Sequence, residues 1–227
     1  MDFAAHAGKL GLPFKNLDLL EEALTHRSYL NEHKSAKAHN ERLEFLGDAV
    51  LELSSTRFLF DAYPAKPEGE LTAYRAALVN TVSIAAVAES LGMNDMLLLS
   101  KGEKRDTGRA REVILANAFE AVVGAVYLDQ GYEAADTFLR THLYPKLSSI
   151  IEKKAYQDAK SRFQEAAQDK RGVTPSYKVV REDGPDHDRE FTVGVYLKDE
   201  EYARGTGKSK QEAEQTAAKA ALATTGW

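Results

Sequence analysis

The apolar residues of this chain change their spacing near residue 170, and this change restricts the fold more than any other feature. Up to about Lys154 they recur every three or four residues, as on one face of an α-helix. From Pro175 onward, residues 177–180 and 191–197 instead follow the pattern of β-strands. Such a sequence favours two separate cores, one between helices and one between helices and a sheet.

The individual segments give the expected order of elements. Asn16 can cap a first helix, and a long helix over 40–62 stops before Pro64. Further helices are expected over 70–79, 82–91, 110–129 and 132–143, and after them a helix over 159–169, three strands, and a helix over 209–223. We therefore predict a mainly α N-terminal domain over residues 1–153 and a small α+β domain, with the order α-β-β-β-α, over residues 157–227.

The net charge and the cysteine content restrict the possible partners of the chain only slightly. The formal net charge is −5, with 18 Lys and Arg against 22 Asp and Glu in residues 1–156 and 12 against 13 in the remainder. Neither part has the basic excess of many nucleic-acid-binding proteins, so the position of each basic residue matters more than the total. The absence of cysteine excludes disulfides and thiolate metal sites.

Two features of the sequence bear on cellular location. Residues 1–6 lack the basic region and the apolar run of a secretory signal. The most apolar stretch, residues 113–128, is interrupted by Asn117 and Glu120 and does not fit a membrane span. We expect a cytoplasmic protein that does not enter a membrane.

Acidic residues gather on one face of the long helix over 40–62. Glu41, Glu44 and Asp48 fall within an arc of about 60° on this helix. Apolar residues flank them, and like charges at i and i+4 repel one another. A divalent cation would compensate this charge.

A second helix repeats the feature. Asn117 and Glu120 lie one turn apart in the apolar segment 113–128, and Glu68 lies where a loop meets the helix over 70–79. Ligands that are all oxygen atoms suit Mg²⁺, with Mn²⁺ as a substitute. The residues alone thus indicate a magnesium site that draws on two helices.

The segments that carry these acids resemble a known family. Residues 39–50, His-Asn-Glu-Arg-Leu-Glu-Phe-Leu-Gly-Asp-Ala-Val, closely resemble the signature of ribonuclease III. Residues 23–29, 67–69 and 114–121 are similar to further segments of the family's catalytic domain. The resemblance covers essentially the whole chain, in the order of the family.

The resemblance implies a role for each acid. It places metal ligands at Glu41, Asp48 and Glu120, and at Asn117, whose position is often Asp in the family. The catalytic acids that it implies are Asp48, Glu120, Glu44 and Glu68. An Asn oxygen coordinates Mg²⁺ but carries no charge, so we expect a weakened metal affinity.

The activity that the resemblance implies is hydrolysis of double-stranded RNA by a metal-activated water, which leaves 5′-phosphate and 3′-hydroxyl ends. Its substrates are expected to include precursors of ribosomal and messenger RNA. Family members resemble one another in forming homodimers whose paired sites each cut one strand. Phe45, apolar and central in the signature, is a candidate for the dimer contact, with ordinary core packing as the alternative.

Residues 158–224 resemble a double-stranded RNA-binding domain. The similar segments are 163–165 on its first helix, 184–187 between its first two strands, and 205–210 before its last helix. The RNA contacts that this implies come from Gln164, Glu165, His187, Lys208 and Lys210. The two lysines stand beside a helix N-terminus, which already favours phosphate.

This C-terminal part departs from the family at one point. The family commonly has further basic residues after Lys210, whereas this chain has Gln211 and Glu212. Fewer cations are then available to neutralise phosphates. We expect a weaker RNA affinity that is more sensitive to salt.

Two alternatives to a nuclease stay open. A non-catalytic RNA-binding protein, like the mitochondrial ribosomal proteins that resemble ribonuclease III, would lack the acids, and only Asn117 favours it. A helical scaffold would give no reason for the RNA-binding part. A nucleotide cofactor is not expected, because the segment 207–209, Gly-Lys-Ser, lacks the earlier glycine of a phosphate-binding loop and has Tyr202 there.

Overall fold

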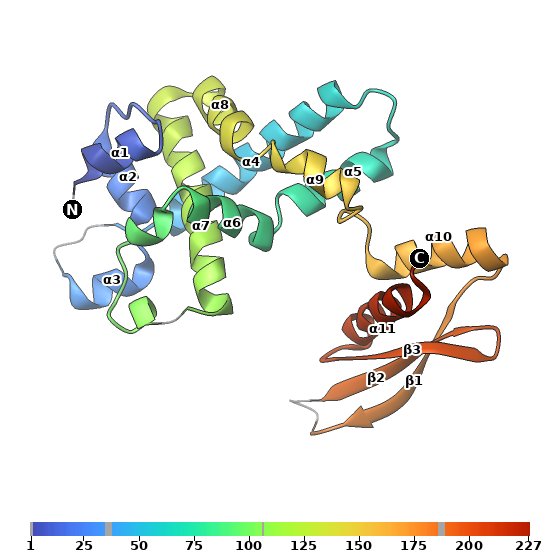
Figure 1. Cartoon of the computed structure of the whole chain (residues 1–227). Helices are drawn as coiled ribbons and strands as arrows, with labels where there is room; N and C mark the ends of the chain where they lie inside the picture. The colour runs from blue at the N-terminus through green and yellow to red at the C-terminus, as the bar shows by residue number, and fades with distance from the viewer. Residues whose placement is uncertain (1, 35–37, 106, 186–188) are drawn as a thin grey trace. The chain divides into compact units, whose positions relative to one another are not determined.

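The chain divides into two compact units, Met1–Tyr156 and Gln157–Trp227 (Figure 1). The computed structural model describes residues 2–34, 38–105, 107–185 and 189–227. The first unit is helical, and the second has the order α-β-β-β-α with an antiparallel sheet. The predicted fold class is therefore confirmed.

The long helices of the first unit begin and end close to the predicted residues. The α-helices of this unit, long and short, are α1 Phe3–Lys9, α2 Leu17–Leu24, α3 Arg27–Glu32, α4 Glu41–Ala62, α5 Glu68–Leu78, α6 Thr81–Ser90, α7 Arg109–Gln130, α8 Tyr132–His142 and α9 Lys146–Glu152. Asn16 caps α2 as predicted, since its side chain accepts a hydrogen bond from the backbone N–H of Asp18. Helices α1, α3 and α9 were not predicted, because they have six or seven residues each, too few for a helical period to be recognised.

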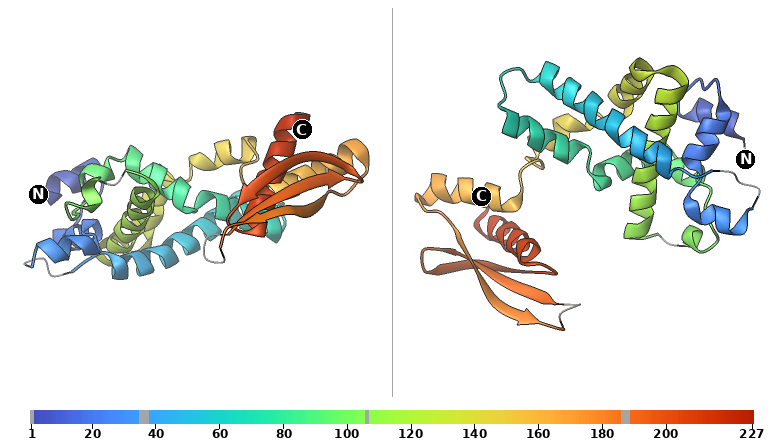
Figure 2. Two further views of the ribbon diagram at one scale, coloured as in Figure 1. Left: turned by 90° about the horizontal axis from the view of Figure 1, so that it is seen from below. Right: turned by 180° about the vertical axis from the view of Figure 1, so that it is seen from behind.

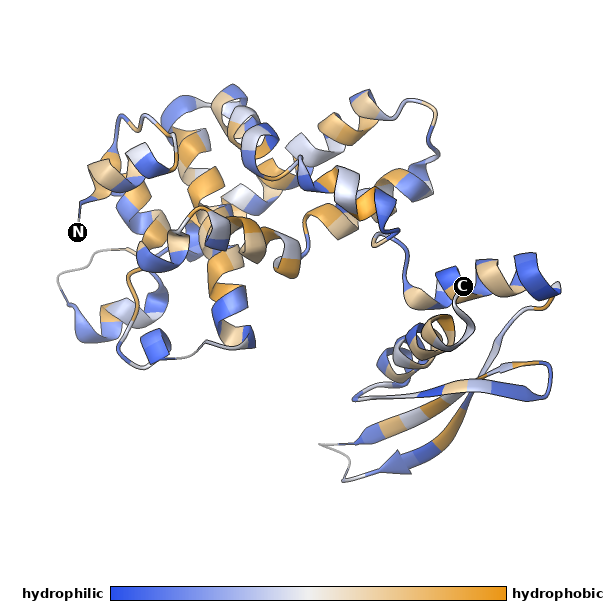
Figure 3. Cartoon of the chain, in the orientation of Figure 1, coloured by the Kyte–Doolittle hydropathy of each residue, from blue (hydrophilic) through white to orange (hydrophobic). Residues whose placement is uncertain are grey.

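Helices α4 and α7 cross at the centre of the first unit (Figures 1 and 2). Helix α7 is hydrophobic along most of its length (Figure 3) and packs against α2, α4, α6 and α8. Phe119 and Val122 of α7 have no exposed surface. The apolar stretch 113–128 therefore lies in the central core helix of this unit.

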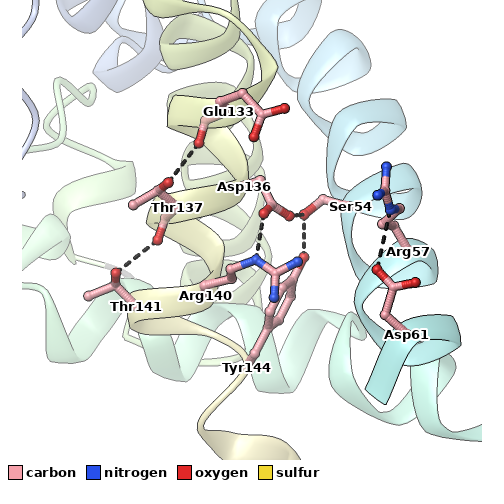
Figure 4. Close-up of polar contacts among 9 residues, drawn as sticks. All are labelled: Ser54, Arg57, Asp61, Glu133, Asp136, Thr137, Arg140, Thr141 and Tyr144. Atoms are coloured by element: carbon pink, nitrogen blue, oxygen red, sulfur yellow. Dashed lines mark hydrogen bonds and ion pairs between the residues drawn. The ribbon is translucent and has the colours of Figure 1, made fainter. Parts of the chain in front are cut away.

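A polar network joins α8 to α4 (Figure 4). The buried carboxylate of Asp136 accepts hydrogen bonds from Ser54 Oγ and Arg140 Nε, both at 2.5 Å. Ser54 Oγ also lies 2.5 Å from the hydroxyl of Tyr144, whose ring stacks on Phe58 with centroids 4.3 Å apart. Each polar group in this interface is thus hydrogen-bonded, which is what makes its burial tolerable.

The apolar helices of the first unit belong to its core. No single helix of the described residues is long and apolar enough to cross a membrane; only α5 and α6 together meet that criterion, and they are bent by 46°. Leu78 of α5 and Ile84 of α6 are buried in the core between the helices.

The second unit is a sheet covered by two helices. Its elements are α10 Ala159–Arg171, β1 Ser176–Asp183, β2 Glu190–Leu197, β3 Glu200–Gly207 and α11 Lys210–Thr225, with the strand order β1-β2-β3. Helix α11 approaches β3 so closely that a Cβ at Gly205 would lie 2.1 Å from the backbone nitrogen of Ala217. Phe163 of α10 is fully buried and stacks on Trp227, with ring centroids 5.7 Å apart.

Candidate active site and RNA-binding surface

Two glycines allow α4 and α7 to touch through their backbones. A Cβ at Gly47 would lie 1.8 Å from the carbonyl oxygen of Glu120, and a Cβ at Gly124 would lie 2.3 Å from the carbonyl oxygen of Leu43. Any larger residue at either position would force the helices apart. The contact brings the acidic face of α4 directly against the turn of α7 that carries Glu120.

Three carboxylates meet at this crossing. Glu120 is half-buried, and its pKa is raised to about 7 by burial first, and then by the negative charges of Asp48 and Glu44. Burial, together with Glu41 and Asp48, also raises the pKa of Glu44. Among the described residues no Lys or Arg side chain forms an ion pair with Glu44, Asp48 or Glu120, so their mutual repulsion is not compensated.

Glu41 lies at the edge of this group. It is the first residue of α4 and is exposed, with one carboxylate oxygen 3.5 Å from Arg27 Nη1 and the other 3.8 Å from His39 Nδ1. His26, one residue before Arg27, has its pKa lowered mainly by burial, and its Nδ1 accepts a hydrogen bond from the backbone N–H of Ser28. His26 thus caps α3.

Asn117 stands one turn before Glu120 on α7, and both side chains are half-buried among buried neighbours. Its amide oxygen and the nearby carboxylates are the oxygen donors that Mg²⁺ and Mn²⁺ prefer. Within the described part of the chain, no three His, Asp or Glu side chains already stand close enough to hold an ion. The uncompensated charge and the all-oxygen donors nevertheless suit a divalent cation.

Glu68 does not join the other acids within one copy of the chain. It begins α5, accepts a hydrogen bond from Thr72 Oγ1 at 3.0 Å, and lines a cavity of about 440 Å³ beside the far end of α4. The cavity is lined by Thr56, Leu59, Phe60, Lys66, Glu68, Leu71, Thr72 and Arg75. Phe60 follows Asp48 by 12 residues, a rise of about 18 Å along α4.

Four of the five predicted RNA-binding residues lie on the surface of the second unit. Gln164 and Glu165 are exposed on α10, and Lys208 and Lys210 are exposed where β3 leads into α11. His187, the fifth, lies outside the described residues.

The side chains that contact Lys210 were not predicted from the sequence. Its Nζ lies 3.5 Å from Glu182 Oε1 and 5.6 Å from the centre of the Phe191 ring. The carboxylate of Glu212 accepts a hydrogen bond from the backbone N–H of Lys208 at 2.8 Å. The segment 209–212, Ser-Lys-Gln-Glu, signals this capping arrangement, whereas nothing in the sequence links Glu182 to Lys210.

Fold and site together are those of a nuclease domain followed by a module for double-stranded RNA. Residues 16–147 match the Ribonuclease-III-like family, and residues 159–224 match the double-stranded RNA binding motif. Ribonuclease 3 of Bacillus licheniformis is 49% identical over 217 residues, which are 95% of this chain and 86% of that protein. Ribonuclease 3 of Bdellovibrio bacteriovorus is 44% identical over 215 residues, 94% of this chain and 92% of that protein.

A solved structure agrees with these sequence relatives. The first unit is similar to the nuclease domain of ribonuclease III from Campylobacter jejuni, with 39% identity and a TM-score of 0.58, over 63% of this chain and 99% of that one. The chain belongs to the ribonuclease III family and is an endonuclease for double-stranded RNA.

Proposed function

We propose that this enzyme hydrolyses phosphodiester bonds of double-stranded RNA at the α4–α7 crossing with the help of Mg²⁺, leaving 5′-phosphate and 3′-hydroxyl ends. The observation that carries the proposal is that the charges of Asp48 and Glu44 raise the pKa of Glu120, while no Lys or Arg of the described residues pairs with any of these three acids. A protein keeps such a costly group of charges where a cation or a substrate compensates it.

The ligands that we assign to Mg²⁺, or to Mn²⁺ in its place, are Glu41, Asp48, Asn117 and Glu120. When bound, the ion would lower the pKa of a water molecule and offset the negative charge that develops on the phosphoryl oxygens. Glu120 is half-buried whereas Glu41 and Asp48 are exposed, so it would hold its position with less freedom than these two. Glu44, one turn before Asp48, would orient water by hydrogen bonding.

The exposed apolar side chains of α4 support a homodimer. Phe45, Leu53 and Phe60 are 81%, 60% and 67% exposed, and they fall within an arc of about 80° on one face of α4. A two-fold axis near Leu53 would place Phe45 of each copy opposite the cavity beside Phe60 of the other. The similar nuclease domain from Campylobacter jejuni is described as structurally flexible in a region involved in dimer formation, which fits a dimer here as well.

The same arrangement would explain the position of Glu68. Glu68 lines the cavity that we assign to Phe45 of the second copy. Because Phe45 follows Glu44 directly, the dimer would bring Glu68 of the partner subunit towards the acids of the first. We therefore keep Glu68 as a catalytic acid, supplied across the dimer.

The second unit would hold the duplex through Gln164, Glu165, His187, Lys208 and Lys210. Such contacts read the shape of A-form RNA rather than its sequence. Double-helical regions of ribosomal and other precursor RNAs are suitable substrates for this chemistry. We further propose that residues 1–153 and 157–227 are its two domains and that it acts in the cytoplasm.

Cleavage of a long, end-labelled RNA duplex across a Mg²⁺ titration tests this proposal. The wild-type enzyme is expected to cut the duplex, but not a single strand of the same sequence, only when metal is present. Glu120→Gln is expected to bind the duplex without cutting it. Glu133→Gln, which removes an exposed carboxylate from α8, serves as the control and should cut normally.

One result would favour the non-catalytic alternative. If the wild-type protein binds the duplex but does not cut it at any concentration of Mg²⁺ or Mn²⁺, Asn117 has replaced an essential ligand. Cleavage that survives in Glu120→Gln would instead place the active site elsewhere.

A further inference from the structure

One acidic side chain of the second unit lies beside Lys210, which faces RNA in our proposal. Glu182, near the end of β1, has its Oε1 atom 3.5 Å from Lys210 Nζ and its Oε2 atom 3.5 Å from Arg189 Nη1. Lys210 begins α11, and Arg189 directly precedes β2. A single carboxylate therefore contacts cations at both of these places.

The register of the sheet creates this contact. Glu182 of β1 pairs with Phe191 of β2, and Phe191 pairs with Gly207 of β3. Lys210 follows Gly207 by three residues, and its side chain extends over the Phe191 ring. Its ammonium group can thus reach across β2 to the carboxylate on β1.

A second carboxylate already occupies the start of α11. Glu212 accepts the hydrogen bond from the backbone N–H of Lys208, and Ser209 Oγ accepts one from the backbone N–H of Glu212 at 3.1 Å. Both of these backbone N–H groups at the start of α11, where a helix favours phosphate, therefore already have an acceptor within the protein. The carboxylate of Glu182 thus binds the side chain of Lys210, and the carboxylate of Glu212 binds the backbone at the start of α11.

We propose that Glu182 is an intramolecular competitor of RNA phosphate and sets the affinity of this enzyme for duplex RNA. The inference rests on the proposed RNA-binding role of Lys210. In the free protein Glu182 holds Lys210 and Arg189; in the complex, phosphates replace it and the carboxylate returns to water. Each phosphate contact then gains less free energy, and fewer counterions are released on binding.

Binding of a labelled RNA duplex to the full chain tests this competition. The affinity is measured over a range of salt concentrations in EDTA, with a gel to confirm that the duplex stays intact. Glu182→Gln is expected to bind about three to ten times more tightly than the wild type at low salt, because an exposed ion pair no longer has to break. The plot of log affinity against log salt should become steeper by about one, and the advantage should shrink as salt rises.

The matched control is Glu200→Gln at the other end of the sheet. Glu200 is exposed, pairs with Leu197 at the β2–β3 turn, and carries the same charge. Its replacement should leave both affinity and slope unchanged. In a Lys210→Gln background the effect of Glu182→Gln should also fall clearly, because the pair is already broken. Thermal unfolding followed by circular dichroism verifies that each variant is folded.

Three results would overturn the proposal. They are an unchanged affinity and slope in Glu182→Gln, an equal gain in Glu200→Gln, and a full effect of Glu182→Gln in the Lys210→Gln background. A wild-type protein that binds no duplex at any salt concentration would overturn the RNA-binding function itself, and so is distinguishable from these.

Discussion

A β-carbon on Gly47 would lie 1.8 Å from the carbonyl oxygen of Glu120. The residue that lets α4 approach α7 therefore touches the backbone of the acid that the approach brings to the site. Packing and catalysis depend on the same contact, because any increase in the spacing of the helices also separates Asp48 and Glu44 from Glu120.

Gly47→Ala tests this dependence. The methyl group cannot fit against the backbone of α7, so the helices must separate, and we expect the free energy of unfolding to fall by about 3 kcal/mol. Cleavage should fall further than the loss of folded protein explains. Urea unfolding followed by circular dichroism measures the first effect, and assays at saturating folded enzyme measure the second.

Gly8→Ala is the control for this substitution. Nothing lies within 4 Å of a Cβ at Gly8 in α1, so the change should be neutral or stabilise by up to about 1 kcal/mol. Equal stabilities of Gly47→Ala and the wild type would contradict the backbone contact.

The charge of Glu120 predicts how stability depends on pH in the metal-free enzyme. Its pKa is about 7 in the folded state against an ordinary value of 4.5, so between these values the folded state retains a proton that the unfolded state loses. The free energy of unfolding therefore falls as pH rises through this window. The difference corresponds to about 3 kcal/mol, and solvent screening of a partly exposed group reduces it to about 1–2 kcal/mol.

Urea unfolding in EDTA at a series of pH values measures this decline. Glu120→Gln lacks the carboxyl group whose pKa is about 7 and should lose most of this decline, whereas Glu133→Gln on α8 should retain it. Identical pH profiles for Glu120→Gln and the wild type would show that another group is responsible.

Local patterns predicted the long helices and the acids, because both are properties of neighbouring residues in the chain. The separations across the α4–α7 crossing, and the hydrogen bond between Ser54 and Asp136, depend on residues far apart in sequence, 82 positions in the latter case. The contact of Lys210 with Glu182 likewise depends on the register of three strands. Such pairings arise only when the tertiary structure forms.

Asn117→Asp should lower the Mg²⁺ concentration needed for half-maximal cleavage by about three- to ten-fold, because the affinity of oxygen-ligand sites rises with the number of charged ligands. Without metal, the same change adds a fourth carboxylate to the group formed by Glu44, Asp48 and Glu120 and should destabilise the fold. We therefore expect Asn117→Asp to need less Mg²⁺ in the cleavage assay and to be less stable than the wild type when metal is absent. Asn94→Asp, an exposed position before α7, adds the same charge and should change neither property.

Phe45 is 81% exposed in the single chain, so its removal should cost the monomer little stability. If its ring fills the cavity beside Phe60 of the partner subunit, Phe45→Ala should weaken the dimer by about 2–3 kcal/mol, or roughly 30- to 150-fold in dissociation constant. Sedimentation equilibrium measures this change. Val82→Ala on α6, which removes a side chain that is 65% exposed, is the control.

The same variant also tests whether the dimer is needed to cut both strands of the duplex. Monomers would lack both Glu68 of the partner subunit and a second site facing the opposite strand, so at low enzyme concentration Phe45→Ala should cut slowly and leave nicks in one strand where the wild type makes paired cuts. Higher concentrations should restore paired cutting through mass action. Paired cuts by Phe45→Ala at concentrations where sedimentation shows only monomers would mean that one chain cuts both strands, and the proposed dimer would then have no part in the pairing of the cuts.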